Sequence, residues 1–282
     1  MTPDEFAFLA KVLRRRSGLS LNTSKTGLLE RRLQPVMRRF GFKDVSGLVQ
    51  ELRLGREALA EAMTEAMTVG ETSFFRDEAL FNRLAESVLP PLQYARRREK
   101  RLRLWSAGCA SGQEAYSLAI LLDEMGLGAA GWAVDLIATD LSAEAIARAG
   151  EGRYADCEVE RGLSRERLER HFRKDGEGWQ IGEKLRRMVT FRRFNLLDSY
   201  GWLDDLDIVF CRNVLIYFDR ASKLSVLERI AETLMPDGVL VAGEAEAPRA
   251  ITDIFVEAPG GTGIYTKHGV PAAVAKSISA VV

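Results

Sequence analysis

The sequence contains little cysteine, little histidine and no excess of either charge. Its cysteines, Cys109, Cys157 and Cys211, lie far apart and form no Cys-x-x-Cys pair, so we expect neither a disulfide framework nor a zinc site. The 40 basic and 40 acidic residues cancel, whereas a protein built mainly for nucleic acid usually carries a basic excess. We therefore expect no metal and no nucleic-acid partner.

Long apolar segments are also missing. No stretch approaches the roughly 18 apolar residues that a membrane helix requires. The start of the chain, residues 1–6, has neither the basic region nor the apolar run of a signal peptide. With 282 residues, 46% of them hydrophobic, the chain can form one large domain, or a moderate domain with a small companion. These features predict a cytoplasmic protein that does not insert into membranes.

Residues 1–69 are predicted to form an all-α N-terminal domain, because apolar residues recur there at helical spacing with no strand pattern. Thr2-Pro3-Asp4-Glu5 is a helix start signal, with a capping residue, a proline in the first turn and early acids. A second helix, residues 25–40, carries most of the local positive charge. Arg31 and Arg38 are seven residues apart, as are Arg32 and Arg39, so each pair lies on one stripe of the helix. The arginines form either an ordinary solvated face or a docking surface for an acidic partner.

A glycine turn follows the first predicted strand, residues 102–107. Gly108 and Gly112 bracket the turn, and an apolar helix covers about residues 113–125. The spacing is not that of a dinucleotide site, and the lysine of a phosphate-binding P-loop is absent. Such a turn suits a nucleoside ligand without phosphates, such as S-adenosylmethionine, although a plain tight turn of an α/β protein is the alternative.

Strands and helices alternate through most of residues 99–282. A second strand, residues 133–140, ends in Asp140, which either accepts hydrogen bonds from ribose hydroxyls or caps the next helix. Residues of about 151–190 break the alternation and predict an inserted antiparallel β-subdomain, with candidate strands at 179–181 and 188–191. Further strands are expected up to Asn195 and at 206–210 and 239–242, with a helix at about 222–234 that stops at 235–238 between the last two. A closing hairpin at 254–266 and a frayed tail at 272–282 follow.

The segment 70–98 is predicted to be a linker followed by a connecting helix. Phe74 and Phe75 precede Arg76 in it, and burial of the two rings would hold Arg76 in a defined place. Alternatively, the phenylalanines are plain core and Arg76 pairs with Asp77 or Glu78.

With these elements placed, the chain resembles the chemotaxis-receptor glutamate methyltransferases of the CheR family over nearly its whole length. The resemblance rests on the following motifs: Thr72-Ser-Phe-Phe-Arg76-Asp, Ser106-Ala-Gly-Cys-Ala-Ser-Gly-Gln-Glu114-Ala-Tyr-Ser, Ala138-Thr-Asp140, Asn195-Leu196-Leu197, Phe210-Cys-Arg-Asn-Val-Leu-Ile-Tyr-Phe-Asp219 and Pro236-Asp-Gly238. It implies a class I S-adenosylmethionine methyltransferase fold, with a Rossmann-like mixed sheet that ends in an antiparallel hairpin.

The resemblance also implies roles for individual residues. The cofactor S-adenosylmethionine, which leaves as S-adenosylhomocysteine, would be bound by Thr72, Arg76, Glu114, Asp140, Asn195, Leu196, Cys211 and Arg212. Arg76 and Tyr217 would lie beside the reacting carboxylate as the catalytic residues. Arg32, Arg38 and Arg39 match the family's receptor-facing helix. The expected partner is the cytoplasmic helical bundle of methyl-accepting chemotaxis receptors, bound by a monomeric enzyme.

The sequence departs from the family pattern at three places. Gly70 replaces an asparagine that touches the cofactor, so one contact is expected to be missing. Gln113 and Ala115 replace a Glu and a Pro beside Glu114. Pro35 replaces one basic position of the receptor-facing helix.

The chemistry of glutamate methylation agrees with this interpretation. A glutamate carboxylate has an ordinary pKa of about 4.3 and is already a nucleophile at neutral pH, so direct displacement needs no general base. The two histidines, His171 and His268, lie outside every motif. A nucleic-acid amino-methyltransferase would instead place an Asp/Asn-Pro-Pro-aromatic turn at residues 211–214. An interaction module on an inactive methyltransferase fold would be expected to lose Asp140, Glu114 or Arg76.

Overall fold

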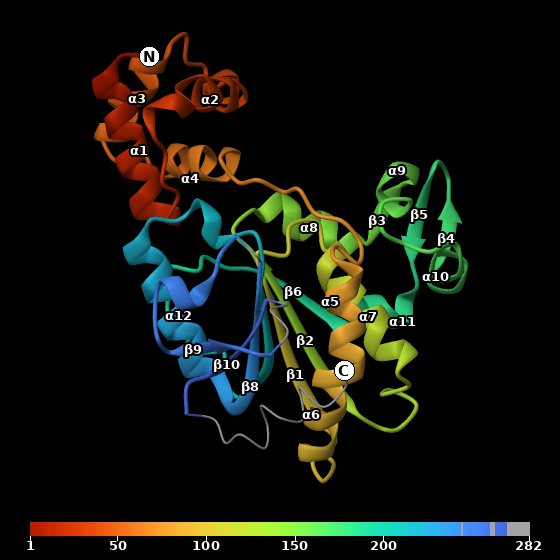
Figure 1. Cartoon of the computed structure of the whole chain (residues 1–282). Coiled ribbons are helices and arrows are strands. Elements are labelled where there is room, and N and C mark those ends of the chain that lie inside the picture. The colour runs from red at the N-terminus through yellow and green to blue at the C-terminus, as the bar shows by residue number, and fades with distance from the viewer. Residues whose placement is uncertain (244, 260–262, 270–282) are drawn as a thin grey trace.

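The computed structural model describes residues 1–243, 245–259 and 263–269. An all-helical N-terminal part stands on a larger α/β part, and a small antiparallel sheet projects from the opposite side (Figure 1). The expected frayed tail, residues 272–282, and most of the turn of the closing hairpin lie outside the described residues.

The N-terminal helices form where the sequence predicts them. Thr2 caps the first helix, because its side chain accepts a hydrogen bond from the Glu5 N–H while the Glu5 carboxylate accepts one from the Thr2 N–H. Leucines such as Leu9, Leu33 and Leu59 are fully buried between the helices. The helices are α1 (Pro3–Ser17), α2 (Thr26–Phe40, which continues through Pro35), α3 (Val45–Arg53) and α4 (Glu57–Ala66), with the 3-10 turn η1 (Thr23–Lys25) before α2.

The connecting helix is interrupted. It consists of α5 (Glu78–Arg83), the π-helical turn η2 (Leu84–Val88) and α6 (Leu89–Ala95). Pro90 and Pro91 follow the π turn after one intervening residue, Leu89. Proline has no N–H to donate to the preceding turn, so the regular α-helical bonding cannot continue through this point.

The main sheet has the order β6-β2-β1-β7-β8-β10-β9 in the described part of the chain. The strands from β6 to β8 run parallel, and β10 pairs antiparallel with both β8 and β9. The strand order reverses between β1 and β7, where an open α/β sheet forms its ligand crevice. The strands are β1 (Arg101–Ala107), β2 (Ala133–Asp140), β6 (Val189–Arg193), β7 (Leu206–Cys211), β8 (Leu234–Ala242), β9 (Phe255–Glu257) and β10 (Ile264–Lys267).

Strand β8 begins earlier than the sequence indicates. Its pairing with β7 shifts from Leu206–Leu234 to Ile208–Val239, so the residues around Pro236 form a bulge between two paired positions. A bulge tolerates a proline that cannot donate to the ladder.

Helices cover both faces of the sheet. The core on one face includes α5, α6 and α7 (Gln113–Glu124), and the core on the other includes α12 (Arg220–Thr233) and residues 194–206. Consecutive residues of a strand point to opposite faces and so belong to different cores, as Phe210 and Cys211 do. Helix α8 (Ala143–Glu151) follows β2.

The inserted lobe is antiparallel, with the strand order β3-β5-β4. The predicted strand at 179–181 is β5, but the predicted strand at 188–191 belongs to β6 of the main sheet, so the antiparallel sheet itself ends at Ile181. The lobe comprises β3 (Arg153–Ala155), α9 (Asp156–Val159), α10 (Arg165–His171), β4 (Phe172–Asp175) and β5 (Gly178–Ile181), and α11 (Glu183–Met188) leads back to the main sheet.

Candidate active site

A cleft opens at the carboxyl ends of β1, β2 and β7, next to the point where the strand order reverses. It encloses about 1100 Å³, counting the part open to solvent. The linker between α4 and α5 forms one wall of it. The sequence-predicted residues in the lining are Thr72, Arg76, Glu114, Asp140, Asn195, Leu196, Arg212 and Tyr217.

The glycine turn forms part of the cleft wall. Gly108 has a φ of 75°, and a Cβ built there would lie 2.3 Å from Cγ2 of Val214. Gly112, with a φ of 91°, occupies the N-cap of α7. Only glycine satisfies both the left-handed backbone and the close approach at Gly108, so the turn packs directly on the loop after β7.

Asp140 ends β2 and lines the cleft. Its two carboxylate oxygens accept hydrogen bonds from the N–H groups of Ala110 and Ser142, both at 2.9 Å. The cap of α8 is Ser142, whose hydroxyl accepts the Ala145 N–H, so Asp140 does not fill that role itself. Burial raises the pKa of Asp140, while these backbone donors oppose the rise.

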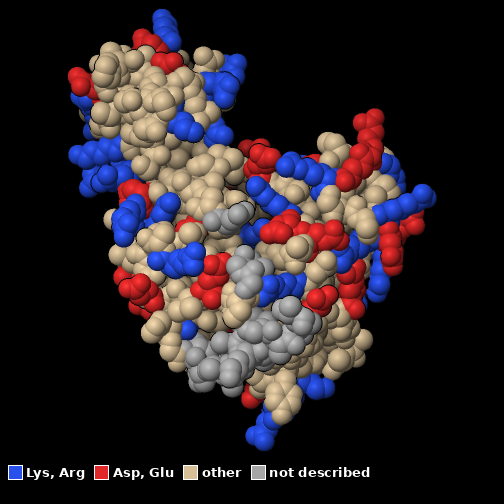
Figure 2. Space-filling model, in the orientation of Figure 1, with Lys and Arg blue, Asp and Glu red and all other residues tan. Residues whose placement is uncertain are grey.

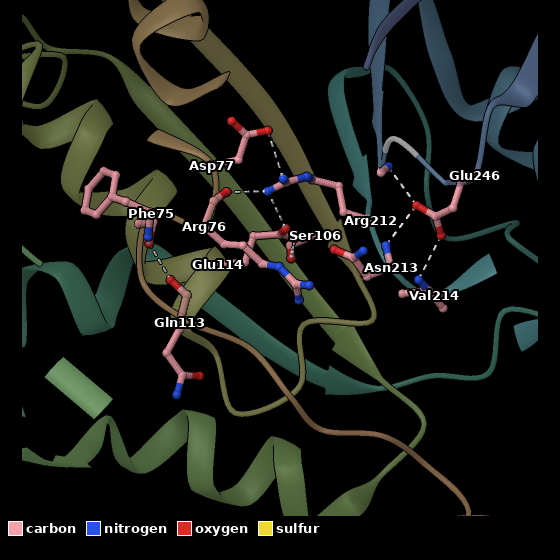
Figure 3. A network of polar contacts seen from close by, with 12 residues as sticks. Phe75, Arg76, Asp77, Ser106, Gln113, Glu114, Arg212, Asn213, Val214 and Glu246 are labelled. Atoms are coloured by element: carbon pink, nitrogen blue, oxygen red, sulfur yellow. Dashed lines mark hydrogen bonds and ion pairs between the residues drawn. The ribbon is translucent and has the colours of Figure 1, made fainter. Parts of the chain in front are cut away.

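Glu114, in the first turn of α7, faces the same cleft. It accepts a hydrogen bond from the Ser106 hydroxyl at 2.9 Å and lies 3.7 Å from the Arg212 guanidinium. Burial raises the pKa of Glu114, and the charge of Arg212 acts in the opposite direction. Figure 3 shows Arg212 placed between Glu114 and the linker residues Arg76 and Asp77.

The linker is held by its phenylalanines, as the sequence indicates. Phe74 is fully buried and packs edge-on against Tyr154 of the lobe, and Phe75 packs against Phe81. The Phe75 N–H donates to the Ser117 hydroxyl at 2.8 Å. Because Phe75 has a φ of 44°, these contacts hold a strained backbone beside Arg76.

Arg32 does not belong to an exposed arginine stripe. Its guanidinium donates hydrogen bonds to the carbonyls of Met67 and Thr68, at 2.8 and 2.7 Å. It is half-buried, whereas Arg38 and Arg39 on the same helix are exposed. Arg32, which the resemblance places on the receptor-facing helix, thus ties α2 to the linker that lines the cleft.

Cys211 is another of the residues expected to bind the cofactor. It is fully buried, and its side chain packs in the core on the α12 face of the sheet, so it does not line the cleft. The side chain of Asn195 lines the cleft but is already engaged, because it donates to the Arg16 carbonyl at 2.6 Å and accepts the Leu197 N–H. Leu196 adds an apolar surface.

Two features of the site were missed by sequence reasoning. Glu246 binds the backbone of the loop after β7, and no motif signals it other than the nearby Gly243. The loop between α1 and α2 reaches the cleft, where the Ser20 N–H donates to the Tyr217 carbonyl at 2.8 Å and Leu19 bridges to Phe218. Both contacts depend on residues far apart in the sequence.

The cleft suits a nucleoside ligand that carries a cationic amino acid. Glu114 and Asp140 supply carboxylates for hydroxyl and ammonium groups. The Nε atom of Arg212 is buried without a hydrogen-bond partner among the described residues. The space beside Gly70 is open, since a Cβ there would meet nothing within 4 Å.

A Rossmann-like sheet with this strand order, a glycine turn without phosphate-binding lysine and paired carboxylates at the switch point defines the class of S-adenosylmethionine-dependent methyltransferases. The family described as "CheR methyltransferase, SAM binding domain" matches residues 70–263, and "CheR methyltransferase, all-alpha domain" matches residues 4–68. The chain belongs to the CheR family, and its cofactor is S-adenosylmethionine.

Curated relatives agree with this assignment. The chain is 42% identical over 255 residues to "Chemotaxis protein methyltransferase 1" of Pseudomonas aeruginosa, covering 89% of this chain and 93% of the relative. It is 41% identical over 249 residues to "Chemotaxis protein methyltransferase Cher2" of Pseudomonas putida, covering 86% and 90%. It is 33% identical to the "Chemotaxis protein methyltransferase" of Salmonella typhimurium, covering 86% and 83%.

Two kinds of feature are absent from the described residues. No helix there has both the length and the apolar character to cross a membrane. No three histidine, cysteine or acidic side chains in those ranges are grouped so as to hold a metal ion.

Proposed function

We propose that this enzyme forms methyl esters on glutamate side chains of the cytoplasmic helical bundle of chemotaxis receptors. The observation that carries the proposal is the composition of the cleft: Arg76 and Tyr217 line it together with Glu114 and Asp140, and no histidine lines it in the described part of the chain. An acceptor that is already ionised at neutral pH needs no residue to remove a proton.

The residues of the cleft then bind and orient. Asp140 and Glu114 are suited to the hydroxyl and ammonium groups of S-adenosylmethionine, which when bound supplies an activated methyl group on sulfur. Thr72, Asn195, Leu196 and Arg212 complete the walls. Arg76 and Tyr217 hold the incoming carboxylate and exclude water, and neither takes up a proton.

The N-terminal helices are proposed to contact the receptor. Arg38 and Arg39 are exposed near the end of α2, and Figure 2 shows Lys and Arg side chains projecting from this part of the molecule. Guanidinium groups bind carboxylates in a bidentate manner, which suits the acidic surface of receptor helices. Residues 1–69 would thus dock the substrate, residues 70–98 would connect the two parts, and residues 99–282 would carry out methyl transfer. The enzyme would act as a monomer in the cytoplasm.

The docking part of the proposal is tested by charge reversal. Replacing Arg38 and Arg39 together by Glu should abolish methylation of receptor fragments and leave the affinity for S-adenosylhomocysteine unchanged, because both side chains lie outside the cleft lining. Added salt should weaken the wild-type reaction, since exposed ion pairs are screened. Equal loss of cofactor affinity in the double variant would show that these arginines are structural.

The chemical part is tested by a pH–rate profile at saturating cofactor. Tyr217→Phe and Arg76→Ala should both lower turnover, Arg76→Ala by more because a charge is lost, and Arg76→Lys should restore only part of it. None of these changes should add or remove an ionisation. A limb with an apparent pKa between about 6 and 8 that disappears in one variant would reveal general-base catalysis and refute the mechanism.

A further inference from the structure

Glu246 is a buried carboxylate that binds four backbone N–H groups. One oxygen accepts from Asn213 at 2.8 Å and from Gly243 at 2.7 Å. The other accepts from Val214 at 2.8 Å and from Leu215 at 2.6 Å. The side chain is buried (3% exposed) and does not line the cleft, so it cannot serve as a ligand of the cofactor there. Figure 3 shows the carboxylate facing the start of the loop that carries Arg212.

The position of Glu246 follows from the end of the sheet. Cys211 of β7 and Ala242 of β8 are the last paired residues, and beyond them the strands no longer satisfy each other's N–H groups. A Cβ on Gly243 would lie 2.7 Å from the Glu246 carboxylate, so glycine is needed there. The Glu246 carboxylate thus accepts hydrogen bonds from backbone N–H groups that no longer have a partner strand.

The bonded loop has a left-handed residue and adjoins the working residues of the cleft. Asn213 has a φ of 61°, a conformation that asparagine adopts more readily than most residues other than glycine. Val214 packs against the Gly108 turn, and the 3-10 turn η3 (Leu215–Tyr217) ends at Tyr217. Arg212, immediately before the loop, bonds the Arg76 carbonyl at 2.8 Å.

We propose that Glu246 is a positioning residue for methyl transfer: its carboxylate holds residues 213–215 in the conformation that presents Arg212 and Tyr217 to the cleft. The acceptor and the cofactor never touch it. An amide cannot replace the carboxylate, because its NH2 group would oppose two of the four N–H donors. The inference rests on the proposed roles of Arg212 and Tyr217, so its test includes a measurement that does not depend on activity.

Asp207 supplies a matched control. It is a buried acid near the start of β7, whose other end leads into the loop that Glu246 binds. Its carboxylate accepts the Arg103 N–H at 2.8 Å and pairs with Arg96. Asp207→Asn should lower the melting temperature without disturbing the cleft, whereas Glu246→Gln should disturb the loop. Glu246→Asp keeps the charge on a shorter side chain and serves if the amide variant fails to fold.

The first readout is hydrogen exchange of the backbone amides of residues 213–215 in the intact chain. Protection should fall in Glu246→Gln and remain in Asp207→Asn. The second is the reaction at a temperature where all variants are folded: kcat should fall about 10- to 100-fold in Glu246→Gln, with a smaller change in the affinity for S-adenosylhomocysteine, as expected of misplaced groups. Glu246→Asp should lie between this variant and the wild type in both readouts.

Unchanged protection of these amides in both Glu246 variants would overturn the inference, whatever the activity. Lost protection with wild-type kcat would overturn it as well, because the loop would then not need to be fixed. A loss of protection with no turnover in any protein, wild type included, would leave the holding role of Glu246 standing and contradict the proposed function instead.

Discussion

Arg32→Ala should weaken cofactor binding, although Arg32 lies in the N-terminal helices. The variant loses two hydrogen bonds from a charged donor to the carbonyls of Met67 and Thr68. Each such bond is worth about 1.5–3 kcal/mol when well shielded. Because Arg32 is half-buried and only part of this free energy orders the linker, we expect a loss of about 1–2 kcal/mol in binding, or roughly 5- to 30-fold in Kd.

Calorimetric titration with S-adenosylhomocysteine measures this loss directly. Arg31→Ala is the matched control, because Arg31 is the neighbouring arginine and its side chain is exposed. Both bonds come from one guanidinium nitrogen, Nη1, which lies one bond further along the side chain than a lysine ammonium, so Arg32→Lys should recover only part of the affinity. If a folded Arg32→Ala binds within twofold of the wild type, the linker does not depend on Arg32 and the argument fails.

Three further changes test the cleft and its surroundings. Asp140→Ala should weaken S-adenosylhomocysteine binding by about 1–3 kcal/mol in the same titration, and unchanged affinity would remove Asp140 from the site. Gly70→Asn should tighten binding by about 0.5–1.5 kcal/mol, because the open space beside Gly70 accepts a side chain; weaker binding would contradict this. Burial lowers the pKa of His171 below 6.5, so the stability that its neutral form contributes is present above pH 6.5 and is lost as the pH falls through the lowered pKa. In thermal melts, the melting temperature of His171→Gln should therefore fall less on acidification than that of the wild type.

The sequence predicted the parts of the fold that local patterns determine. Thr2 and Glu5, which cap α1, are close together in the sequence, so the cap is a local pattern. The glycine turn at 108–112 joins β1 to α7 as expected. The strand expected at 188–191 was assigned to the inserted lobe, because short strands do not reveal their partners; in the structure it pairs with β2.

The candidate site was predictable where a motif lies at the end of a strand. Asp140 and Glu114 are examples, because parallel strands bring their carboxyl ends to one edge. The role of Arg32 was not predictable, since a helical stripe shows which arginines share a face but not which carbonyls lie opposite. Glu246 was missed for the same reason: its donors at 213–215 precede it by about thirty residues.

We propose above all that the enzyme esterifies receptor glutamates. The direct measurement is incubation of the protein with methyl-labelled S-adenosylmethionine and cytoplasmic receptor fragments, followed by mild alkali. Esters hydrolyse under these conditions, whereas methylated amines do not. We predict that label enters the fragments, is released as methanol by base, and is absent when the acceptor glutamates are replaced by alanine. Label that resists base, or no label with fragments from any receptor of the same cell, would contradict the account.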